Sequence, residues 1–538
     1  MSLWKLYDKE KTTSGVPVLV MAMVSGLANA LILAIMNKAI GSAPKEVLSL
    51  KYLVLFALTF GVFFIGKKYA LSQTSEMVEK IIRKIRMRIS DKIRHSELRF
   101  LENIGSETIY TRITHDTNLI SQSAIIVICA LQSSVMLVFC LLYVAVISKI
   151  AFLMTAFAIT VGIMLYMSHR KITVGYLHET TIKESRFFER LSFILNGFKE
   201  LKINEKKSDD FFRTVDTLAD ETEEIKIKTG LRFVTDMMFS DVFFYLLIAA
   251  IIFLMPKIHM AFGGQLIRVI TAILFIMGPL NLIVASFPII TRANVAAENL
   301  YELEEQIDRA SRKGAGKRKP LETFDSIIFE DVCFSYLDKA GDPAFTVGPI
   351  NMTISRGEVL FIVGGNGSGK STVLKLLTGL YYPSSGAIKI DGQEITDSSY
   401  QSYRELFSII FTDFHLFDRL YGIDGVDYGK FKELLRKMEL DKKTDLADGE
   451  FTNISLSTGQ RKRLAMIVSM FEDKQIYVYD EWAADQDPIF RKYFYEVLLQ
   501  EMKEQGKTIV AVSHDDRYFD VAGRILKMEY GKFVEEKG

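Results

Sequence analysis

Residues 364–372 read Gly-Gly-Asn-Gly-Ser-Gly-Lys-Ser-Thr and lie between an apolar run, 359–363, and a helical run, 370–380. Glycines let the backbone curl so that its N–H groups point at phosphate oxygens, and the lysine meets the outer phosphates. The serine can bind Mg²⁺ where the helix begins. This strand–loop–helix pattern predicts a nucleotide-phosphate loop made of Gly364, Asn366, Gly367, Gly369, Lys370, Ser371 and Thr372.

Two adjacent acids, Asp480 and Glu481, end a second apolar run at 476–479. Carboxylates at the end of a buried strand need a partner, and Mg²⁺ together with an attacking water provides one. With a phosphate loop in the same chain, we expect Asp480 to belong to the metal shell and Glu481 to polarise the water.

Around these motifs, short β-branched runs alternate with helical runs over 321–538. The alternation predicts an α/β domain with a largely parallel sheet. The preceding stretch, 309–320, is rich in Gly, Lys and Arg and ends in Pro320, as is typical of a linker. Lys and Arg total 66 against 65 Asp and Glu, a net charge of +1. This balance leaves no global basic field, so nucleic acid is not an expected partner.

The remainder of the chain, 1–308, has the character of a membrane domain. Hydrophobic residues make up 49% of the sequence although 24% is charged, so the two kinds must be segregated. A helix needs about 20 apolar residues to cross a bilayer core. Runs of roughly that length predict six spans in contact with membrane lipid, at about 16–36, 52–66, 124–147, 151–168, 233–255 and 265–290.

The distribution of Lys and Arg predicts the orientation of the spans. Eleven basic residues occur over 67–112 and thirteen over 170–232. Both long loops, both termini and the α/β domain are therefore expected in the cytoplasm. The loops are periodic and nearly free of Pro and Gly, which predicts that spans two to five continue as long helices beyond the membrane.

Between the phosphate loop and the acidic strand, residues 456–460 read Leu-Ser-Thr-Gly-Gln. Leu-Ser-x-Gly-Gln opening a helix resembles the signature of ATP-binding cassette (ABC) ATPases. The resemblance implies that ATP and Mg²⁺ are the cofactors and that Ser457, Gly459 and Gln460 meet the γ-phosphate bound by an opposite subunit. Two copies would then sandwich two ATP molecules, so the chain is expected to work as a homodimer.

The resemblance extends over 321–538 and implies further roles. Tyr336 matches the aromatic residue that stacks on adenine. His514 matches the switch histidine near the γ-phosphate, which implies a catalytic role beside Glu481. Asp487 matches the end of the loop after the catalytic acid and is expected to belong to the ATP-binding residues. The family usually has Gln at the Mg²⁺-sensing position where this chain has Thr412. Because a Thr hydroxyl is about two bonds shorter than a Gln carbonyl, we expect Thr412 to reach the ion through water.

Two departures from the general family pattern, Thr412 and the loop after Glu481, narrow the match. Three segments carry it: 411–417, Phe-Thr-Asp-Phe-His-Leu-Phe; 457–465, Ser-Thr-Gly-Gln-Arg-Lys-Arg-Leu-Ala; and 480–491, Asp-Glu-Trp-Ala-Ala-Asp-Gln-Asp-Pro-Ile-Phe-Arg. Together they resemble the bacterial branch of ABC exporters for cyclic peptides, peptide siderophore precursors and microcins. This implies an all-α six-helix membrane domain of exporter type fused to an α/β P-loop ABC domain in the bacterial cytoplasmic (inner) membrane. The cargo would be a cyclic or otherwise modified peptide of the lipopeptide, siderophore-precursor or microcin type. A lipid or multidrug exporter and a membrane-tethered regulatory ATPase that does not transport remain alternatives.

Polar residues inside the spans point to a cargo cavity. Ionisable groups at membrane depth are costly and usually face a cavity or a partner. We expect Asp241 of the fifth span and Asn281 of the sixth to line the substrate cavity.

Overall fold

The computed structural model describes residues 3–10, 15–42, 50–254, 265–311, 321–338 and 341–537. The chain divides into two compact units. The helical unit comprises Met1–Arg94 and Ile104–Asp308, and the sheet unit comprises His95–Asn103 and Arg309–Gly538. Residues 312–320 of the predicted linker lie outside the described residues.

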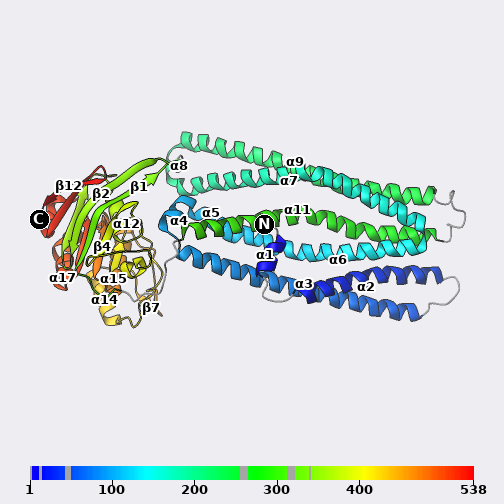
Figure 1. Cartoon of the computed structure of the whole chain (residues 1–538), viewed down its shortest axis with the longest axis horizontal. Coiled ribbons are helices and arrows are strands. Elements are labelled where there is room, and N and C mark those ends of the chain that lie inside the picture. The colour runs from blue at the N-terminus through cyan, green and yellow to red at the C-terminus, as the bar shows by residue number, and fades with distance from the viewer. Residues whose placement is uncertain are drawn as a thin grey trace. The chain divides into compact units, whose positions relative to one another are not determined.

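Helices of very different lengths make up the helical unit (Figure 1). They are α1 (Leu3–Glu10), α2 (Val16–Ser42), α3 (Leu50–Arg94), α5 (Ser106–Thr111), a π-helical turn η1 (Arg112–Asp116), α6 (Thr117–Ile147), α7 (Lys149–Asn196), α8 (Phe198–Ile203), α9 (Glu205–Phe253) and α11 (Leu266–Ala310). A further short helix, α4 (Leu98–Ile104), follows α3. Each predicted span falls largely within one of the long helices.

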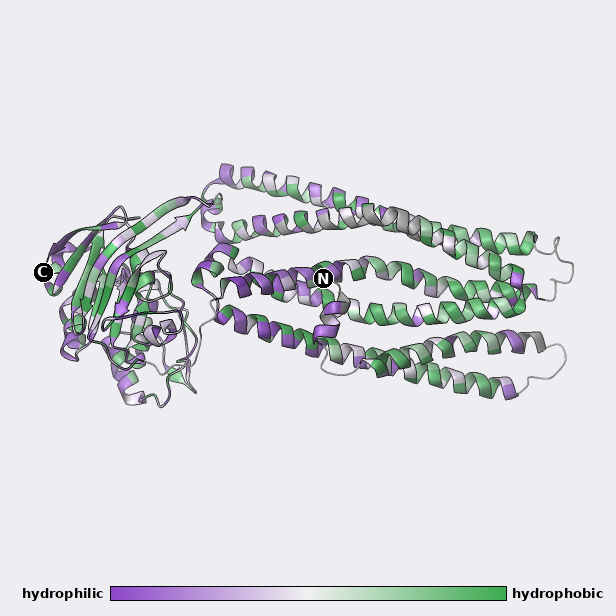
Figure 2. Cartoon of the chain, in the orientation of Figure 1, coloured by the Kyte–Doolittle hydropathy of each residue, from purple (hydrophilic) through white to green (hydrophobic). Residues whose placement is uncertain are grey.

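The long helices are apolar at one end and polar at the other (Figure 2). Helices α3, α7 and α9 contain 45, 48 and 49 residues. At 1.5 Å per residue such helices are roughly 70 Å long, more than twice the ~30 Å thickness of the hydrocarbon core. They therefore have the length that a span with a cytoplasmic extension requires.

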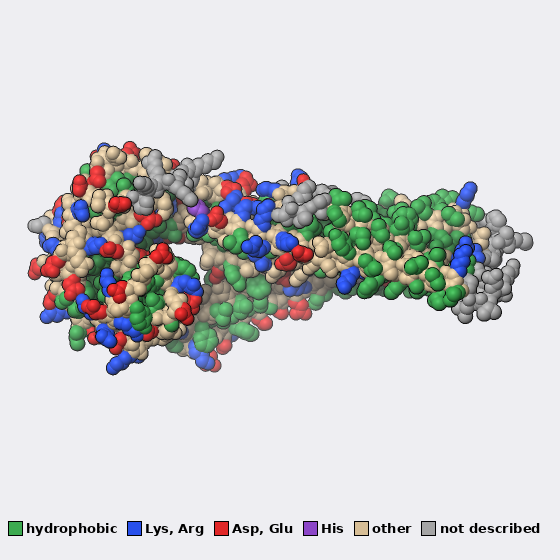
Figure 3. Space-filling model, turned by 90° about the horizontal axis from the view of Figure 1, so that it is seen from below, with side chains coloured by type: hydrophobic (Ala, Val, Ile, Leu, Met, Phe, Trp, Pro, Cys, Tyr) green, Lys and Arg blue, Asp and Glu red, His purple; other side chains and the backbone are tan. Residues whose placement is uncertain are grey.

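Apolar side chains cover much of the helical unit on the face seen in Figure 3. Exposed examples include Leu53 and Leu58 of α3 and Phe157 of α7. Extended apolar surface of this kind suits contact with lipid. Within the described residues, four helices are long and apolar enough to span a membrane, while Lys149–Met164 and Asp241–Phe253 are shorter apolar segments. The number of six spans stays a prediction.

Over its described residues, the sheet unit contains three sheets. Its strands are β1 (Ser326–Leu337), β2 (Pro343–Ser355), β3 (Val359–Gly364), β4 (Ser385–Ile390), β5 (Gln393–Glu394), β6 (Phe407–Ile410), β7 (Leu446–Ala447), β8 (Glu450–Phe451), β9 (Ile476–Asp480), β10 (Thr508–Val512), β11 (Arg524–Glu529) and β12 (Lys532–Lys537). Its helices include α12 (Lys370–Leu377), α13 (Tyr400–Arg404), α14 (Tyr428–Lys437), α15 (Thr458–Glu472), η3 (Trp482–Asp485), α16 (Pro488–Tyr493), η4 (Phe494–Leu498), α17 (Leu499–Glu504) and η5 (Asp516–Val521).

The central six-stranded sheet has the order β12-β11-β3-β10-β9-β6, and β11, β3, β10, β9 and β6 run parallel. Strands β3, β9 and β10 are buried over nearly their whole length, because helices cover both faces of a parallel sheet. A second, four-stranded sheet is antiparallel and has the order β2-β1-β4-β5.

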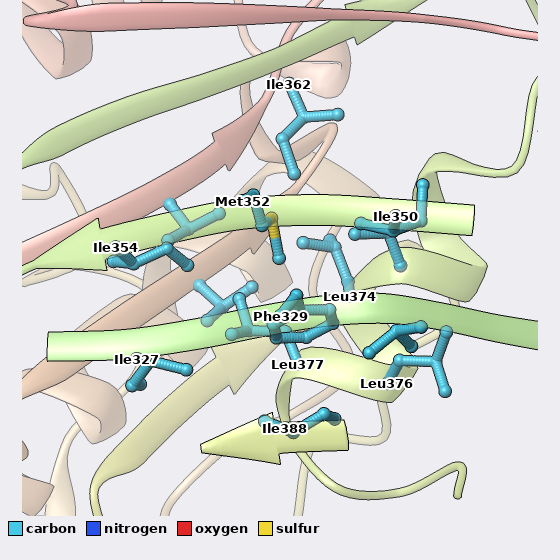
Figure 4. Packing of buried hydrophobic residues seen from close by; sticks show 14 of the residues in the cluster. Ile327, Phe329, Ile350, Met352, Ile354, Ile362, Leu374, Leu376, Leu377 and Ile388 are labelled. Atoms are coloured by element: carbon cyan, nitrogen blue, oxygen red, sulfur yellow. The ribbon is translucent and has the colours of Figure 1, made fainter. Parts of the chain in front are cut away.

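One hydrophobic cluster joins the two larger sheets through α12 (Figure 4). Phe329 of β1 and Met352 of β2 pack in the same cluster as Ile362 of β3, together with Leu374 and Leu377 of α12. The helix that begins at the phosphate loop is therefore anchored by apolar burial on its inner side, which makes its N-terminus a rigid platform.

Candidate active site

Four neighbouring parallel strands bring the predicted motifs to one edge of the sheet. The phosphate loop follows β3, His514 follows β10, Asp480 and Glu481 end β9, and Thr412 follows β6. Strand β10 pairs with both β3 and β9, and β9 pairs with β6. Because the carboxyl ends of parallel strands share an edge, residues that are remote in sequence become neighbours there.

The phosphate loop has the backbone of an anion cradle. Gly369, the residue before α12, has φ +108°, and a Cβ at this position would lie 2.8 Å from the methyl carbon of Met528. Only glycine fits such a turn without strain. Asn366 and Gly367 lie exposed at the tip of the loop, so their backbone is accessible to a ligand.

The buried Lys370 ammonium closes the loop. Its Nζ donates hydrogen bonds to the carbonyl oxygens of Gly364 at 3.0 Å and Gly365 at 2.9 Å. Burial lowers the pKa of Lys370, and the carboxylates of Glu481 and Asp480 oppose this shift. A phosphate group would supply the negative charge that a buried ammonium requires.

Asp480 has the properties of a cation ligand. Its side chain is 3% exposed, and Oδ1 is a buried oxygen without a hydrogen-bond partner among the described residues. Burial raises the pKa of Asp480 and the Glu481 charge adds to the shift, while hydrogen bonds from Ser371 and Thr412 oppose it. A buried, unpartnered carboxylate oxygen beside a hydroxyl fits a divalent cation, because Mg²⁺ prefers oxygen ligands. Ser371 and Asp480 therefore fit Mg²⁺ chemically.

Thr412 lies beside this acid, and its hydroxyl also contacts the Asp480 backbone. Thr412 Oγ1 donates to the Asp480 carbonyl oxygen at 3.2 Å. This bond ties the loop after β6 to the end of β9. The water-mediated metal contact of Thr412 stays a prediction.

Glu481 and His514 form the most direct contact between the predicted catalytic residues. His514 Nε2 lies 2.9 Å from Glu481 Oε1, and the two side chains are 42% and 31% exposed. Glu481 has φ +50° and ψ 36°, a left-handed conformation that is rare for a residue with a side chain. Its carboxylate is thus oriented by the histidine and remains accessible to a water.

The signature helix α15 begins with a reciprocal cap. Ser457 Oγ accepts from the Gln460 backbone N–H, and Gln460 Oε1 accepts from the Ser457 N–H. A Cβ at Gly459 would lie 2.7 Å from the Asp485 carbonyl oxygen, so glycine permits the loop after β9 to approach this helix. Ser457 is exposed, and a capped helix N-terminus with an exposed hydroxyl suits an anion.

Asp487 and Tyr336, both predicted to contact the nucleotide, form hydrogen bonds with other residues of the protein. The Asp487 carboxylate caps α16 by accepting from Ile489 and Phe490 N–H groups, and it pairs with Arg463 at 2.6 Å. The Phe490 backbone hydrogen bond is the largest cause that lowers the pKa of Asp487. The Tyr336 hydroxyl lies 3.1 Å from Thr372 Oγ1. Their contacts with nucleotide stay predictions.

The sequence did not point to Tyr381, which extends this region. Its hydroxyl lies 3.5 Å from that of Tyr336 and donates to Glu102, a residue of α4 within the sheet unit. Lys375 Nζ binds the same carboxylate at 2.7 Å. No motif predicts this contact, because the glutamate and the tyrosine are 279 residues apart.

Asp241 and Asn281, the predicted cavity residues, are in direct contact within the helical unit. Asn281 Nδ2 donates to Asp241 Oδ1 at 2.9 Å, joining α9 to α11. The sequence predicts a cavity role for both residues without indicating that they touch each other, and the fold shows this contact.

The ABC transporter family matches residues 347–484. The ATP-binding protein SyrD of Pseudomonas syringae pv. syringae is 30% identical over 530 residues, covering 96% of this chain and 93% of SyrD. The subtilin transport ATP-binding protein SpaT of Bacillus subtilis is 26% identical over 66% of this chain and 58% of its own.

An ATP-dependent lipid A-core flippase of Paraburkholderia xenovorans is 25% identical over 85% of this chain and 78% of its own. Among solved structures, a bacterial Atm1-family ABC exporter with ATP bound superimposes with a TM-score of 0.76 at 18% identity, covering 97% of this chain and 94% of the other. This likeness confirms the predicted fold class, a helical domain joined to an α/β P-loop domain.

Proposed function

Since the chain belongs to the ABC transporter family and is an ATP-hydrolysing membrane exporter, we propose that it exports a cyclic or otherwise modified peptide. The observation that carries the proposal is the Asp241–Asn281 contact between two otherwise apolar helical segments. Polar groups at membrane depth are costly unless they serve a ligand or a partner. A peptide offers amide donors to a carboxylate, whereas an anionic lipid headgroup would be repelled by it.

The sequence segments 411–417, 457–465 and 480–491, which resemble the peptide-exporter branch, also favour this cargo. The similarity to a subtilin transport protein is in keeping with such a cargo. The similarity to lipid A-core flippases makes a lipid exporter the alternative.

The transport cycle that we propose uses a homodimer. The phosphate loop and Lys370 of one copy bind ATP, and the N-terminus of α15, with Ser457, meets the γ-phosphate from the other copy. Closure of the two ATPase domains would be transmitted by the long helices to a cavity between the spans. Hydrolysis then resets the dimer.

Each residue of the hydrolysis site has a proposed task. Glu481 accepts a proton from, or polarises, the attacking water, and His514 orients the Glu481 carboxylate at 2.9 Å. Mg²⁺ would be held by Ser371 and Asp480 and would neutralise charge on the phosphates. We place the protein in the bacterial cytoplasmic membrane with six spans and with its termini and ATPase domain in the cytoplasm.

Transport by the purified protein in proteoliposomes tests the cargo. We expect ATP-dependent uptake into inside-out vesicles of a labelled cyclic lipopeptide, with weaker uptake of a linear peptide of the same composition. Labelled lipid A is the comparison. Uptake of lipid A alone would support the lipid exporter, and ATP turnover that no compound alters would support a regulatory ATPase.

Asp241→Asn tests the proposed cavity. The substitution preserves shape and can still accept from Asn281, but it removes the charge that a peptide amide would meet. We expect the ratio of peptide-stimulated to basal ATPase activity to fall about fivefold, the equivalent of about 1 kcal/mol. Thr271→Val on α11 is the control, because that hydroxyl donates within its own helix. An unchanged ratio in Asp241→Asn would remove Asp241 from the cargo path.

A further inference from the structure

Lys462, in the second turn of α15, is a fully buried lysine at 0% exposure. Its ammonium donates to the carbonyl oxygen of Glu481 at 2.9 Å and pairs with Asp485 Oδ2 at 2.7 Å. Burial of an ammonium is costly unless the charge is paired and hydrogen-bonded. Both groups that satisfy it belong to the segment just after β9, where the proposed catalytic acid lies.

The backbone that Lys462 holds is a strained one. Glu481 has φ +50°, and such left-handed residues persist only where the surroundings hold them in place. Lys462 acts on the carbonyl of this residue, while His514 contacts its carboxylate. Two residues from different elements thus determine where the Glu481 side chain points.

Lys462 also holds the next residue through its own backbone. The indole Nε1 of Trp482 donates to the Lys462 carbonyl oxygen at 3.0 Å, and the indole is stacked on Phe494 with ring centroids 4.4 Å apart. One residue of α15 therefore contacts Glu481, Trp482 and Asp485. A displacement of α15 would move the catalytic segment with it, because these contacts tie three residues of that segment to Lys462.

We propose that Lys462 is a positioning residue that couples the signature helix to the catalytic acid. It holds the Glu481 peptide so that the carboxylate faces His514, and it transmits movement of α15 to Glu481 when Ser457 at the helix N-terminus meets a γ-phosphate. In the homodimer, Ser457 serves the ATP of one site and Glu481 that of the other, so Lys462 would link the two sites. The inference rests on the proposed roles of Glu481 and Ser457.

Lys462→Met and Lys462→Gln distinguish what the hydrogen bonds of Lys462 contribute from what its positive charge contributes. Met keeps the length and removes the charge and both hydrogen bonds, whereas Gln keeps one N–H donor on a shorter chain. We expect kcat to fall by about 10- to 100-fold in Lys462→Met, because a displacement of about 1 Å at a reacting group has effects of that size. Lys462→Gln should retain an intermediate kcat. The ATP affinity of both variants should stay within about threefold of the parental value.

Lys474→Met is the matched control. Lys474 precedes the N-terminal end of β9, whereas Glu481 follows its C-terminal end, and Lys474 pairs with Glu405 at 2.8 Å. Its loss removes a lysine ion pair from the same domain without touching Glu481, so kcat should stay within about twofold. Equal losses of kcat in the Met variants of both lysines would overturn the inference, since they would reflect general destabilisation.

A double-mutant cycle with Glu481→Gln distinguishes positioning from folding. If Lys462 acts through Glu481, adding Lys462→Met to Glu481→Gln should lower the remaining single-turnover rate by less than about threefold. If instead the two substitutions lowered the single-turnover rate independently, so that the loss in the double variant equalled the product of the two single losses, the inference would be overturned. Should Lys462→Met be too unstable to purify, the same cycle with Lys462→Gln gives the decision.

The Glu481→Gln protein distinguishes a failure of the proposed role of Glu481 from a failure of the inference about Lys462. Parental turnover in Glu481→Gln would overturn the role of Glu481 and with it the coupling. Normal turnover in Lys462→Met beside an inactive Glu481→Gln protein would overturn the inference about Lys462 alone.

Discussion

Replacing Glu481 by Gln is expected to lower kcat for ATP hydrolysis by a factor on the order of 10² or more, while ATP binding persists. Gln preserves the shape of the side chain and can still accept from His514, which lies 2.9 Å from the carboxylate. It cannot take a proton from water at neutral pH. ATP-bound dimers should therefore accumulate.

The measurement is steady-state ATPase activity together with retention of nucleotide by size-exclusion chromatography. Glu496→Gln is the control, because that glutamate pairs with Lys492 on the surface of the sheet unit. Its kcat should match that of the parent. Parental turnover in Glu481→Gln would assign the water to another base.

Mixing two inactive chains is expected to restore activity if the sites are shared. A Lys370→Ala homodimer and a Ser457→Ala homodimer each carry one lesion in both sites. The heterodimer instead has both lesions in one site and none in the other. Random mixing should recover about a quarter of the parental activity, because half of the dimers are heterodimers with one intact site of two.

A control with the same two substitutions gives the opposite result. When one chain carries both Lys370→Ala and Ser457→Ala and is paired with a parental chain, each site of the heterodimer contains one lesion. Differently tagged chains allow the heterodimers to be purified in both cases. Activity in the control heterodimer but not in the test heterodimer would mean that each chain completes its own site.

The sequence alone was enough to predict those parts of the ATPase site that are formed by residues close together in the chain. The phosphate loop at 364–372 and the acidic strand end at Asp480 could be predicted because each is a short motif whose chemistry needs those residues at that spacing. Helix lengths and apolar runs likewise follow from composition along one segment. The resemblance in 456–460 then indicated the family, which the similarity to SyrD confirms.

Sequence motifs were less informative about which groups of the protein a given side chain contacts. The resemblance implies that Asp487 meets nucleotide, which stays a prediction, but it does not indicate that this carboxylate caps α16 and pairs with Arg463. A motif specifies residue type and position, but the group that a carboxylate meets depends on which backbone N–H groups and cations surround it.

Tertiary structure alone decided the contacts between distant segments. The order β3-β10-β9 brings His514 to Glu481, and the crossing of α9 and α11 brings Asn281 to Asp241. Lys462 stands between Arg461 and Arg463 in the sequence, and only the packing of α15 against the segment after β9 places its ammonium beside Glu481 and Asp485. The physical reason is that hydrogen bonds and charge pairs act over a few ångströms in space, whereas sequence reports separation along the chain.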